Sequence, residues 1–239
     1  MIKSILMIII VLAGIISLFA VSTEKSSDIK IKSIDFEVKG DVWGIDVSHH
    51  QGDIDWAEVK RSEPSFVIAK ATEGVFHKDR KFKENIVSAN RSGIPTGAYH
   101  FFSYRYPGKM QARHFLNFIG DAAYCMPLVL DVEYHSGMKR MKDVSGNILD
   151  FVNFVKERTG KYPIIYANCW YYEKYVEPVL KEAPVKWIAS YTYEPNCLHT
   201  MHQSTDKFRI KGIKTYVDYN RFLGTKEEFN EIFFPCKVF

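Results

Sequence analysis

Two acidic residues stand two positions apart at the end of a short apolar run. Asp131 and Glu133 follow residues 127–130, which read Pro-Leu-Val-Leu. Side chains two apart on a strand point to the same side, so both carboxyls are expected in one pocket, about 6–7 Å apart along the backbone. Because close like charges repel, one carboxyl of such a pair is driven to keep its proton. A carboxyl protonated near neutral pH is the general acid that cleavage of a glycosidic bond requires.

Two further aspartates lie where predicted strands end, Asp46 after Gly-Ile and Asp218 after Tyr-Val. Barrel enzymes place their catalytic groups at the carboxyl ends of strands, so both are candidates for the site of Asp131 and Glu133. A helix cap or a turn is the alternative for either aspartate alone. For the acidic pair the alternative is a buried salt-bridge network, with Lys70 as the partner.

Aromatic residues follow the same predicted strands. Sugars present flat C–H faces and a rim of hydroxyls, so rings with polar tips suit a glycan groove. Core packing explains any single ring, whereas their concentration near the acids favours a groove. The rings are those of Tyr99, His100, Phe101, Tyr166, Trp170, Trp187 and Tyr191.

Other chemistries lack their motifs. The histidines at 49, 50, 100 and 202 do not form a pattern such as H-E-x-x-H, and no G-x-S-x-G elbow is present, so neither a metal site, a cofactor nor a serine hydrolase is expected. The net charge is +4, without a run of Lys and Arg among aromatics, which argues against a nucleic-acid partner.

Short β-branched and aromatic runs alternate with segments of helical period, which predicts parallel strands covered on both faces. The predicted fold class is α/β, a single-domain, distorted and incomplete TIM-like (β/α) barrel, with its helical ring interrupted after Tyr191. The strands are expected at 42–47, 66–71, 96–102, 128–133, 163–168, 185–191 and 215–218, with a weaker candidate at 199–204. The helices are expected at 54–63, 81–91, 110–118, 144–158 and 171–182.

The chain begins with the features of a targeting segment. Lys3 precedes an apolar stretch at 5–21, which predicts export of the protein. A cleaved signal peptide and a retained membrane anchor both fit residues 1–21. Residues 22–40 are predicted to be a polar linker, and residues 41–239 the catalytic domain.

Export makes disulfides an expectation for the four cysteines, Cys125, Cys169, Cys197 and Cys236. Four cysteines permit three pairings, and their spacing does not choose among them.

Taken together, these segments resemble the family 25 glycoside hydrolases, the lysozymes that act as N-acetylmuramidases. The resemblance extends from Val42 to Phe222 and consists of several motifs in the family's order. The motifs are G-I-D-V-S-H-H-Q-G at 44–52, F-V-I-A-K-A-T-E-G at 66–74, G-A-Y-H-F at 97–101, P-L-V-L-D-V-E at 127–133, P-I-I-Y-A-N at 163–168, W-I-A-S-Y at 187–191 and V-D-Y-N-R-F at 217–222.

The resemblance implies hydrolysis of peptidoglycan glycan strands at the β-1,4 bond from N-acetylmuramic acid to N-acetylglucosamine, with retention. The protein is expected to be a monomer. By the same resemblance, Glu133 is the general acid, Asp131 tunes it and positions the sugar, and Asp46 and Asp218 are further acids of the pocket. The residues implied to bind substrate are Tyr99, Lys70, Glu73, Tyr166, Trp187, Tyr191 and Gln203.

One segment departs from the family pattern. Where the family has Trp-Gln-Tyr or Trp-Gln-Phe, residues 201–204 read Met-His-Gln-Ser. Gln203 keeps the polar position while the stacking ring is lost, which predicts altered binding at one sugar subsite.

The spacing of the acidic pair also bears on the mechanism. A covalent retaining route needs carboxyls about 5–5.5 Å apart across the bond. Asp131 beside Glu133 on one strand favours the route in which the sugar's own acetamide attacks. Two alternative functions remain. The first is a chitinase-like N-acetylglucosaminidase, but this sequence lacks the longer D-x-x-D-x-D-x-E run of those enzymes. The second is a non-catalytic wall-binding module, and the presence of all four acids argues against it.

Overall fold

The computed structural model describes residues 41–120, 128–135, 141–180 and 185–233. The predicted export segment and linker, together with Cys125 and Cys236, lie outside these residues. In the part of the chain that is described, no helix has both the length and the apolar character needed to cross a membrane.

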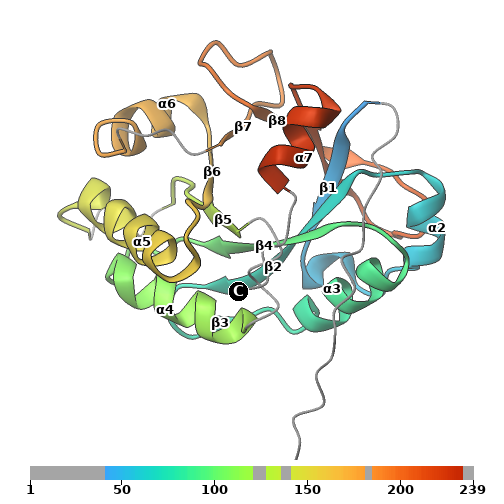
Figure 1. Ribbon diagram of the computed structural model, residues 1–239, viewed down its shortest axis with the longest axis horizontal. Helices are drawn as coiled ribbons and strands as arrows, with labels where there is room; N and C mark the ends of the chain where they lie inside the picture. Colours follow the sequence, from blue (N-terminus) through green and yellow to red (C-terminus); the bar gives the residue numbers. More distant parts are fainter. Residues whose placement is uncertain (1–40, 121–127, 136–140, 181–184, 234–239) are drawn as a thin grey trace, which may run out of the picture. The chain divides into compact units, whose positions relative to one another are not determined.

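Eight strands close into a barrel (Figure 1) in the order β1-β9-β8-β7-β6-β5-β4-β2, and pairing of β1 with β2 completes the circle. All eight predicted strands are present, including the weaker candidate. They are β1 (Trp43–Val47), β2 (Phe66–Glu73), β4 (Thr96–Phe101), β5 (Leu128–Asp131), β6 (Ile164–Ala167), β7 (Lys186–Ala189), β8 (Met201–Phe208) and β9 (Val217–Phe222). A short extra strand that the sequence does not predict, β3 (His77–Lys78), pairs with β2.

The last strand corrects one prediction. Neighbouring strands are parallel from β1 through β2 to β8, whereas β9 runs antiparallel to both β8 and β1. Eight residues, 209–216, connect β8 to β9, too few for the crossover that a parallel strand needs. Asp218 therefore lies near the start of β9 and not at its end. Because the strand is reversed, its start reaches the same mouth of the barrel as the ends of the others.

The helices cover the outside of the barrel (Figure 1) and follow the predicted segments. They are α2 (Trp56–Arg61), α3 (Phe82–Arg91), α4 (Gly108–Ile119), α5 (Val144–Thr159) and α6 (Cys169–Tyr171), which continues as the π-helical turn η4 (Tyr172–Val176). The one-turn 3₁₀ helix η1 (His49–Gln51) follows β1, and α7 (Lys226–Phe233), not predicted, follows β9. No helix joins β7 to β8 or β8 to β9, so the predicted gap after Tyr191 is confirmed.

Local capping explains where the helices begin and end. The Asp55 carboxylate accepts hydrogen bonds from the first turn of α2, and the Asp143 carboxylate accepts one from Gly146 N in α5. Gly160 ends α5 in the left-handed conformation, at φ 72°, which glycine adopts without strain.

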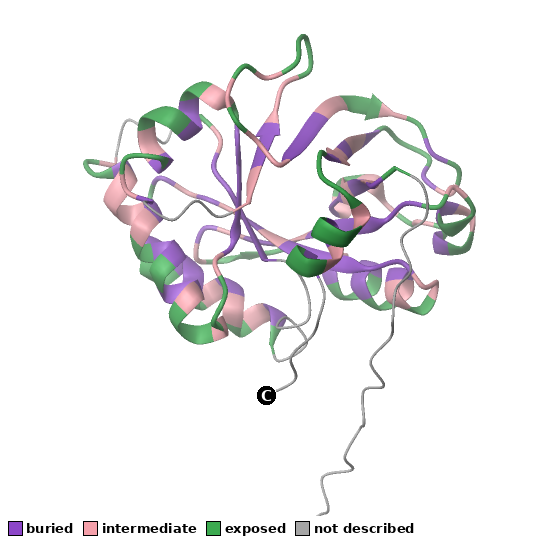
Figure 2. Ribbon diagram, turned by 45° about the horizontal axis from the view of Figure 1, so that its top comes forward, coloured by how far each residue is buried: buried purple, intermediate pink, exposed green. Residues whose placement is uncertain are grey.

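The core of this single domain has two parts, and the inner one closes the barrel at one end. Strand residues facing the helices form the larger cluster, and strand residues facing inward form the smaller one with α7. Phe229 and Phe233 of α7 contact the rings of Phe66, which begins β2, and Phe222, which ends the reversed β9. Figure 2 shows the buried strands at the centre of the fold. Because α7 closes the end where the parallel strands begin, the open mouth of the barrel is the opposite one, where the parallel strands end.

Candidate active site

The mouth of the barrel contains a cavity of about 210 Å³. All four predicted acids line it, as do six of the seven predicted substrate-binding residues. The full lining consists of Asp46, Lys70, Tyr99, Phe101, Val129, Asp131, Glu133, Tyr166, Trp187, Tyr191, Gln203 and Asp218. Glu73 is the exception, because its carboxylate lies outside the lining and accepts a hydrogen bond from Lys70 Nζ at 2.8 Å.

Strand register brings these side chains together from distant parts of the chain. Asp46 of β1 lies directly opposite Asp218 of β9. Across the barrel, Asp131 at the end of β5 is level with Phe101 of β4 and Tyr166 of β6. Lining residues within a strand are two apart, as the alternation of side chains along a strand requires.

Asp131 is buried without an ion-pair partner. It is 8% exposed, and its Oδ1 has no hydrogen-bond partner among the described residues. Burial, followed by repulsion from Glu133, raises the pKa of Asp131 well above its usual range, and the charge of Lys70 offsets this only in part. Lys70 is hydrogen-bonded to Glu73, so the salt-bridge alternative does not describe this pair.

Glu133 occupies the rim of the cavity beyond Asp131. Its side chain is half-buried, and its backbone oxygen accepts a hydrogen bond at 2.8 Å from the hydroxyl of the buried Tyr104. One residue earlier, Val132 N donates to Tyr166 O at 2.8 Å. These bonds fix the segment after β5, so the Glu133 carboxyl is held at the cavity, two residues from Asp131.

Asp46 is the centre of a hydrogen-bond network. Its Oδ2 accepts bonds from Gln203 Nε2 and Asn220 Nδ2, each 2.9 Å long. Gln203 Oε1 in turn accepts from the hydroxyls of Tyr166 and Tyr191. Burial raises the pKa of Asp46 to about 6, although both amide donors oppose the shift.

Asn220 is the site residue that sequence reasoning missed. It is fully buried, and its Oδ1 accepts from Trp187 Nε1 at 3.0 Å, so it couples the wall of the cavity to Asp46. Its position was the available signal, because it lies two residues after Asp218 on one strand and therefore on the same face. Phe101 also lines the cavity, and the Lys70 ammonium lies 4.9 Å from the centre of its ring.

Replacing Asn220 with Ala is expected to reduce the free energy of unfolding by about 1–3 kcal/mol, because Trp187 Nε1 and one side of Asp46 would lose their buried partners. Urea denaturation measures the loss. Equal stability of Asn220→Ala and the wild type would contradict this role.

Two of the predicted groove residues lie elsewhere. His100 points away from the cavity and is buried between the Thr72 hydroxyl and the Gln111 side-chain amide, and burial lowers its pKa to about 3. Trp170 on α6 is 56% exposed, and its ring contacts that of Tyr175. Neither residue is part of the lining, so both are corrections to the predicted groove.

Asp218 gives the site a pH-dependent stability. Burial, followed by repulsion from Asp46 and Asp206, raises its pKa from 3.8 to about 8. The folded state therefore keeps a proton that the unfolded state loses near pH 4, and the resulting stabilisation disappears as the pH rises through about 8.

Between pH 4 and pH 8 the Asp218→Asn variant is consequently expected to lose less stability than the wild type. Urea midpoints measured at half-unit pH intervals give the slope of stability against pH for the wild type and for Asp218→Asn. Identical slopes would show that Asp218 ionises with its ordinary pKa in the folded protein.

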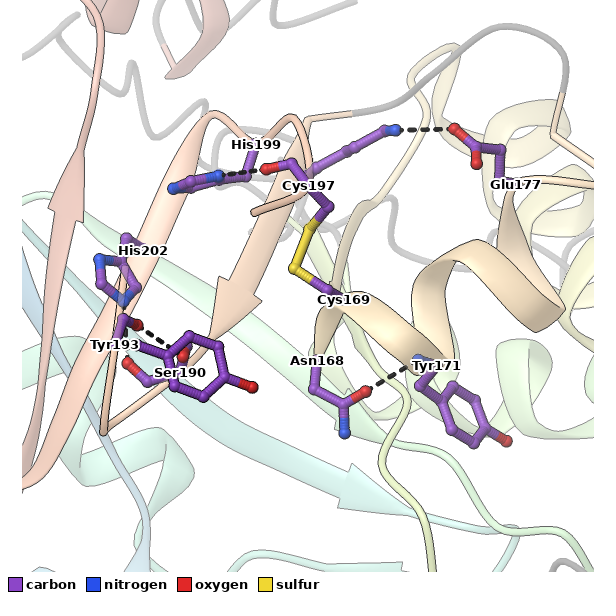
Figure 3. Close-up of a disulfide and its surroundings, with 10 residues drawn as sticks. Asn168, Cys169, Tyr171, Glu177, Ser190, Tyr193, Cys197, His199 and His202 are labelled. Atoms are coloured by element: carbon purple, nitrogen blue, oxygen red, sulfur yellow. Dashed lines mark hydrogen bonds and ion pairs between the residues drawn. A yellow bond between two sulfur atoms is a disulfide. The ribbon is translucent and has the colours of Figure 1, made fainter. Parts of the chain in front are cut away.

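One disulfide is present among the described cysteines, Cys169–Cys197, which closes a separation of 28 residues. It joins the start of α6 to the connection between β7 and β8 (Figure 3). For a loop of this length, loss of the cross-link is expected to lower the free energy of unfolding by about 3–4 kcal/mol. Urea denaturation of Cys169→Ser/Cys197→Ser measures the loss, and an unchanged midpoint would contradict it.

Comparisons with known proteins agree with the geometry. The family model described as glycosyl hydrolases family 25 matches residues 45–213. The chain is 31% identical to lysozyme M1 of Streptomyces globisporus over 202 residues, which cover 77% of this chain and 68% of that relative.

Solved structures show the same architecture. A family 25 glycosyl hydrolase from Bacillus anthracis superposes with a TM-score of 0.70 at 29% identity, covering 85% of this chain and 99% of that one. A bacterial lysozyme from Streptomyces coelicolor gives the same TM-score and identity, with coverage of 81% and 97%. The chain therefore belongs to glycosyl hydrolase family 25.

Proposed function

We propose that this protein is a lysozyme that cleaves the β-1,4 bond between N-acetylmuramic acid and N-acetylglucosamine in peptidoglycan, with net retention. Membership of the family and the lysozyme relatives support glycosidase activity on peptidoglycan. The observation that carries the site assignment is the Asp131–Glu133 pair, which lies in an open cavity with two further acids and a wall of aromatic rings.

In this proposal Glu133 is the general acid. Its half-buried carboxyl at the rim can reach a glycosidic oxygen, whereas the Asp131 carboxyl lies deeper and is almost fully buried. Proton transfer to the leaving oxygen by a positioned carboxyl typically contributes about 10²–10⁴-fold to the rate.

Asp131 is proposed to hold the substrate's 2-acetamido group. Its unpartnered Oδ1 is an acceptor for the acetamide N–H when the carboxyl is ionised. The acetamide oxygen then attacks the anomeric carbon as Glu133 protonates the departing sugar oxygen, which gives a cyclic oxazolinium ion. Water opens this ion from the vacated face and returns its proton to Glu133, so two inversions give retention.

Tyr166, Trp187, Tyr191 and Gln203 are proposed to position the sugar. The Tyr166 and Trp187 rings meet edge to face with centroids 5.0 Å apart. The hydroxyls of Tyr166 and Tyr191 both donate to Gln203 Oε1. Because these rings and amides are already ordered, binding of the sugar does not have to offset the entropic cost of ordering them. Tyr99, Lys70 and Glu73 are proposed as further substrate-positioning residues.

Mass spectrometry of the fragments released from purified peptidoglycan tests the bond. The proposal expects N-acetylmuramic acid at every new reducing end. N-acetylglucosamine there, or faster release of reducing ends from chitin oligomers than from peptidoglycan, would favour the chitinase-like alternative.

The same product also reports the stereochemistry. Proton NMR recorded within the first turnovers is expected to show the β-anomer, the configuration of the bond that was cleaved. An initial α-anomer would exclude both the substrate-assisted and the covalent retaining routes.

The same proposal divides the chain into an export segment at residues 1–21, a linker at residues 22–40 and a catalytic domain at residues 41–239, and the enzyme is proposed to be a monomer. The export segment is either a cleaved signal peptide or a membrane anchor. The Cys169–Cys197 disulfide supports export, because such bonds persist in oxidising compartments outside the cytosol. Cell fractionation with an antibody against the domain tests it, and recovery of the protein in the cytosol would contradict it.

A further inference from the structure

A group of three metal-ligating side chains lies on the outside of the barrel. Glu194 and His199 belong to the connection between β7 and β8, and His202 is the second residue of β8. Each offers one ligand atom, and these atoms lie within 4.8 Å of one another. Gln203, the next residue along β8, lines the catalytic cavity, so by alternation His202 points to the other side of the barrel wall.

Both imidazoles present a nitrogen lone pair to the space shared with the Glu194 carboxylate. His202 Nε2 lies 2.9 Å from Ser190 O, and His199 Nδ1 lies 2.7 Å from Cys197 O. A carbonyl oxygen only accepts hydrogen bonds, so each of these nitrogens carries the ring hydrogen, and the other nitrogen of each neutral ring does not. Figure 3 shows the two rings and the carbonyl groups beside the Cys169–Cys197 disulfide.

The two nitrogens left over are buried, and among the described residues neither has a hydrogen-bond partner. They are His202 Nδ1 and His199 Nε2, and the His202 residue is only 2% exposed. Buried polar atoms are nearly always hydrogen-bonded, so two orphaned nitrogens side by side call for a ligand. A metal cation accepts both lone pairs at once.

The third ligand is the Glu194 carboxylate, which Arg221 holds in place through its other oxygen. Arg221 Nη2 donates to Glu194 Oε1 at 3.0 Å, which leaves Oε2 only 3.3 Å from His202 Nδ1. Two ligand atoms of a tetrahedral zinc ion, each about 2.0–2.1 Å from the metal, stand about 3.3 Å apart. The Glu194 side chain is 71% exposed, so solvent can supply a fourth ligand.

We propose that Glu194, His199 and His202 bind a divalent transition-metal ion, with Zn²⁺ as the ion that suits two imidazoles and one carboxylate. Each ligand has its other polar atom fixed by a second group, as is usual in metal sites: the Ser190 carbonyl, the Cys197 carbonyl and the Arg221 guanidinium. The spacing of the histidines gives no hint of this site, because Glu194 is brought to them only by folding of the connection between β7 and β8.

The metal would join the connection between β7 and β8 to β8 itself. Tyr191 is the second residue of that connection and donates to Gln203 of β8 inside the cavity. A metal bound behind them would therefore fix the wall that these two residues form. The site is structural in this proposal and takes no part in bond cleavage, so it stands or falls independently of the proposed lysozyme activity.

A second group, His49, His77 and Asp79, provides the matched control. Asp79 is already satisfied, because its Oδ2 accepts from His49 N and pairs with His49 Nδ1, and its Oδ1 accepts from Lys81 N. His77→Ala removes an exposed histidine from that group and leaves Glu194, His199 and His202 unchanged.

Isothermal titration of the full, disulfide-bonded chain with ZnCl₂ at pH 7.5, after removal of metals with a chelator, tests the proposal. One Zn²⁺ per chain is expected in the wild type and in His77→Ala, with affinity at least about tenfold weaker in His199→Ala and in Glu194→Gln. These two variants are preferred to substitution of the buried His202, and near-UV circular dichroism confirms that they fold.

Co²⁺ gives a second readout, because a tetrahedral site with histidine ligands produces visible absorption bands that His199→Ala is expected to lose. Absence of Zn²⁺ binding at micromolar concentrations would reduce Glu194 and His202 to an ion pair and overturn the proposal. Loss of binding in His77→Ala alone would place the metal at the other group and overturn it equally.

Discussion

Glu133→Gln is expected to lower the rate of peptidoglycan lysis by about 10²–10⁴-fold while leaving glycan binding nearly unchanged. The amide has the shape of the carboxyl but cannot transfer a proton to the departing oxygen. The loss therefore belongs in kcat and not in KM. Turbidity of a cell-wall suspension measures the rate, and co-sedimentation with insoluble peptidoglycan measures the binding.

Glu58→Gln is the matched control for this variant. Glu58 lies on α2 and pairs with Arg61 of the same helix, outside the cavity lining, so the same chemical change there is expected to leave lysis unaffected. Lysis by Glu133→Gln at the wild-type rate would remove Glu133 from its role and revive the alternative of a non-catalytic wall-binding module.

The second large effect is expected for Asp131→Asn. An amide at this position cannot carry the negative charge that stabilises a forming oxazolinium ion, so kcat is expected to fall by at least about 10²-fold. Stability is expected to be retained or increased, because the substitution removes a buried carboxyl whose ionisation is opposed by burial and by Glu133.

The pH dependence separates this role from a merely structural one. The raised pKa of Asp131 means that ionised Asp131 is scarce at acidic pH, so activity of the wild type is expected to rise on the acidic side of its optimum. The apparent pKa values of this pH–rate profile describe the coupled acids as a group and not one residue. Asp131→Asn is expected to flatten the acidic limb, and a variant that keeps the wild-type profile at full rate would exclude the assisted route.

The positions of the strands and of the acids were accessible from the sequence because they depend on local pattern. The run Leu128–Asp131 is apolar and ends in a carboxylate, and alternation alone puts Glu133 on the same side. Asp46 and Asp218 were identified in the same way. The direction of β9 was missed, although the available signal was the short spacer of residues 209–216, which is too short for the crossover that a parallel strand needs.

Contacts between distant residues account for what the sequence could not give. His100 and Tyr99 are neighbours in an aromatic segment, yet one fills the space between barrel and helices and the other lines the cavity. Asn220 acquires its importance only when β9 lies beside β1 and brings it to Asp46. The pairing of Cys169 with Cys197 likewise depends on the closeness of two connections at one end of the barrel.

The change from the family's Trp-Gln-Tyr or Trp-Gln-Phe pattern has a structural counterpart. Gln203 keeps its place as the acceptor of two tyrosine hydroxyls, so the polar function expected of it is present in the cavity. His202 replaces a ring but is buried on the outer side of the barrel, with its Nδ1 facing Glu194.

A crystal structure of Glu133→Gln with a bound peptidoglycan fragment would test most directly whether the four acids form one catalytic centre. The muramic acid unit is predicted to lie in the cavity with its acetamide against Asp131, and its glycosidic oxygen about 2.6–3.2 Å from the amide at position 133. A glycan bound elsewhere on the barrel, or one whose scissile oxygen is out of reach of position 133, would contradict the proposed mechanism.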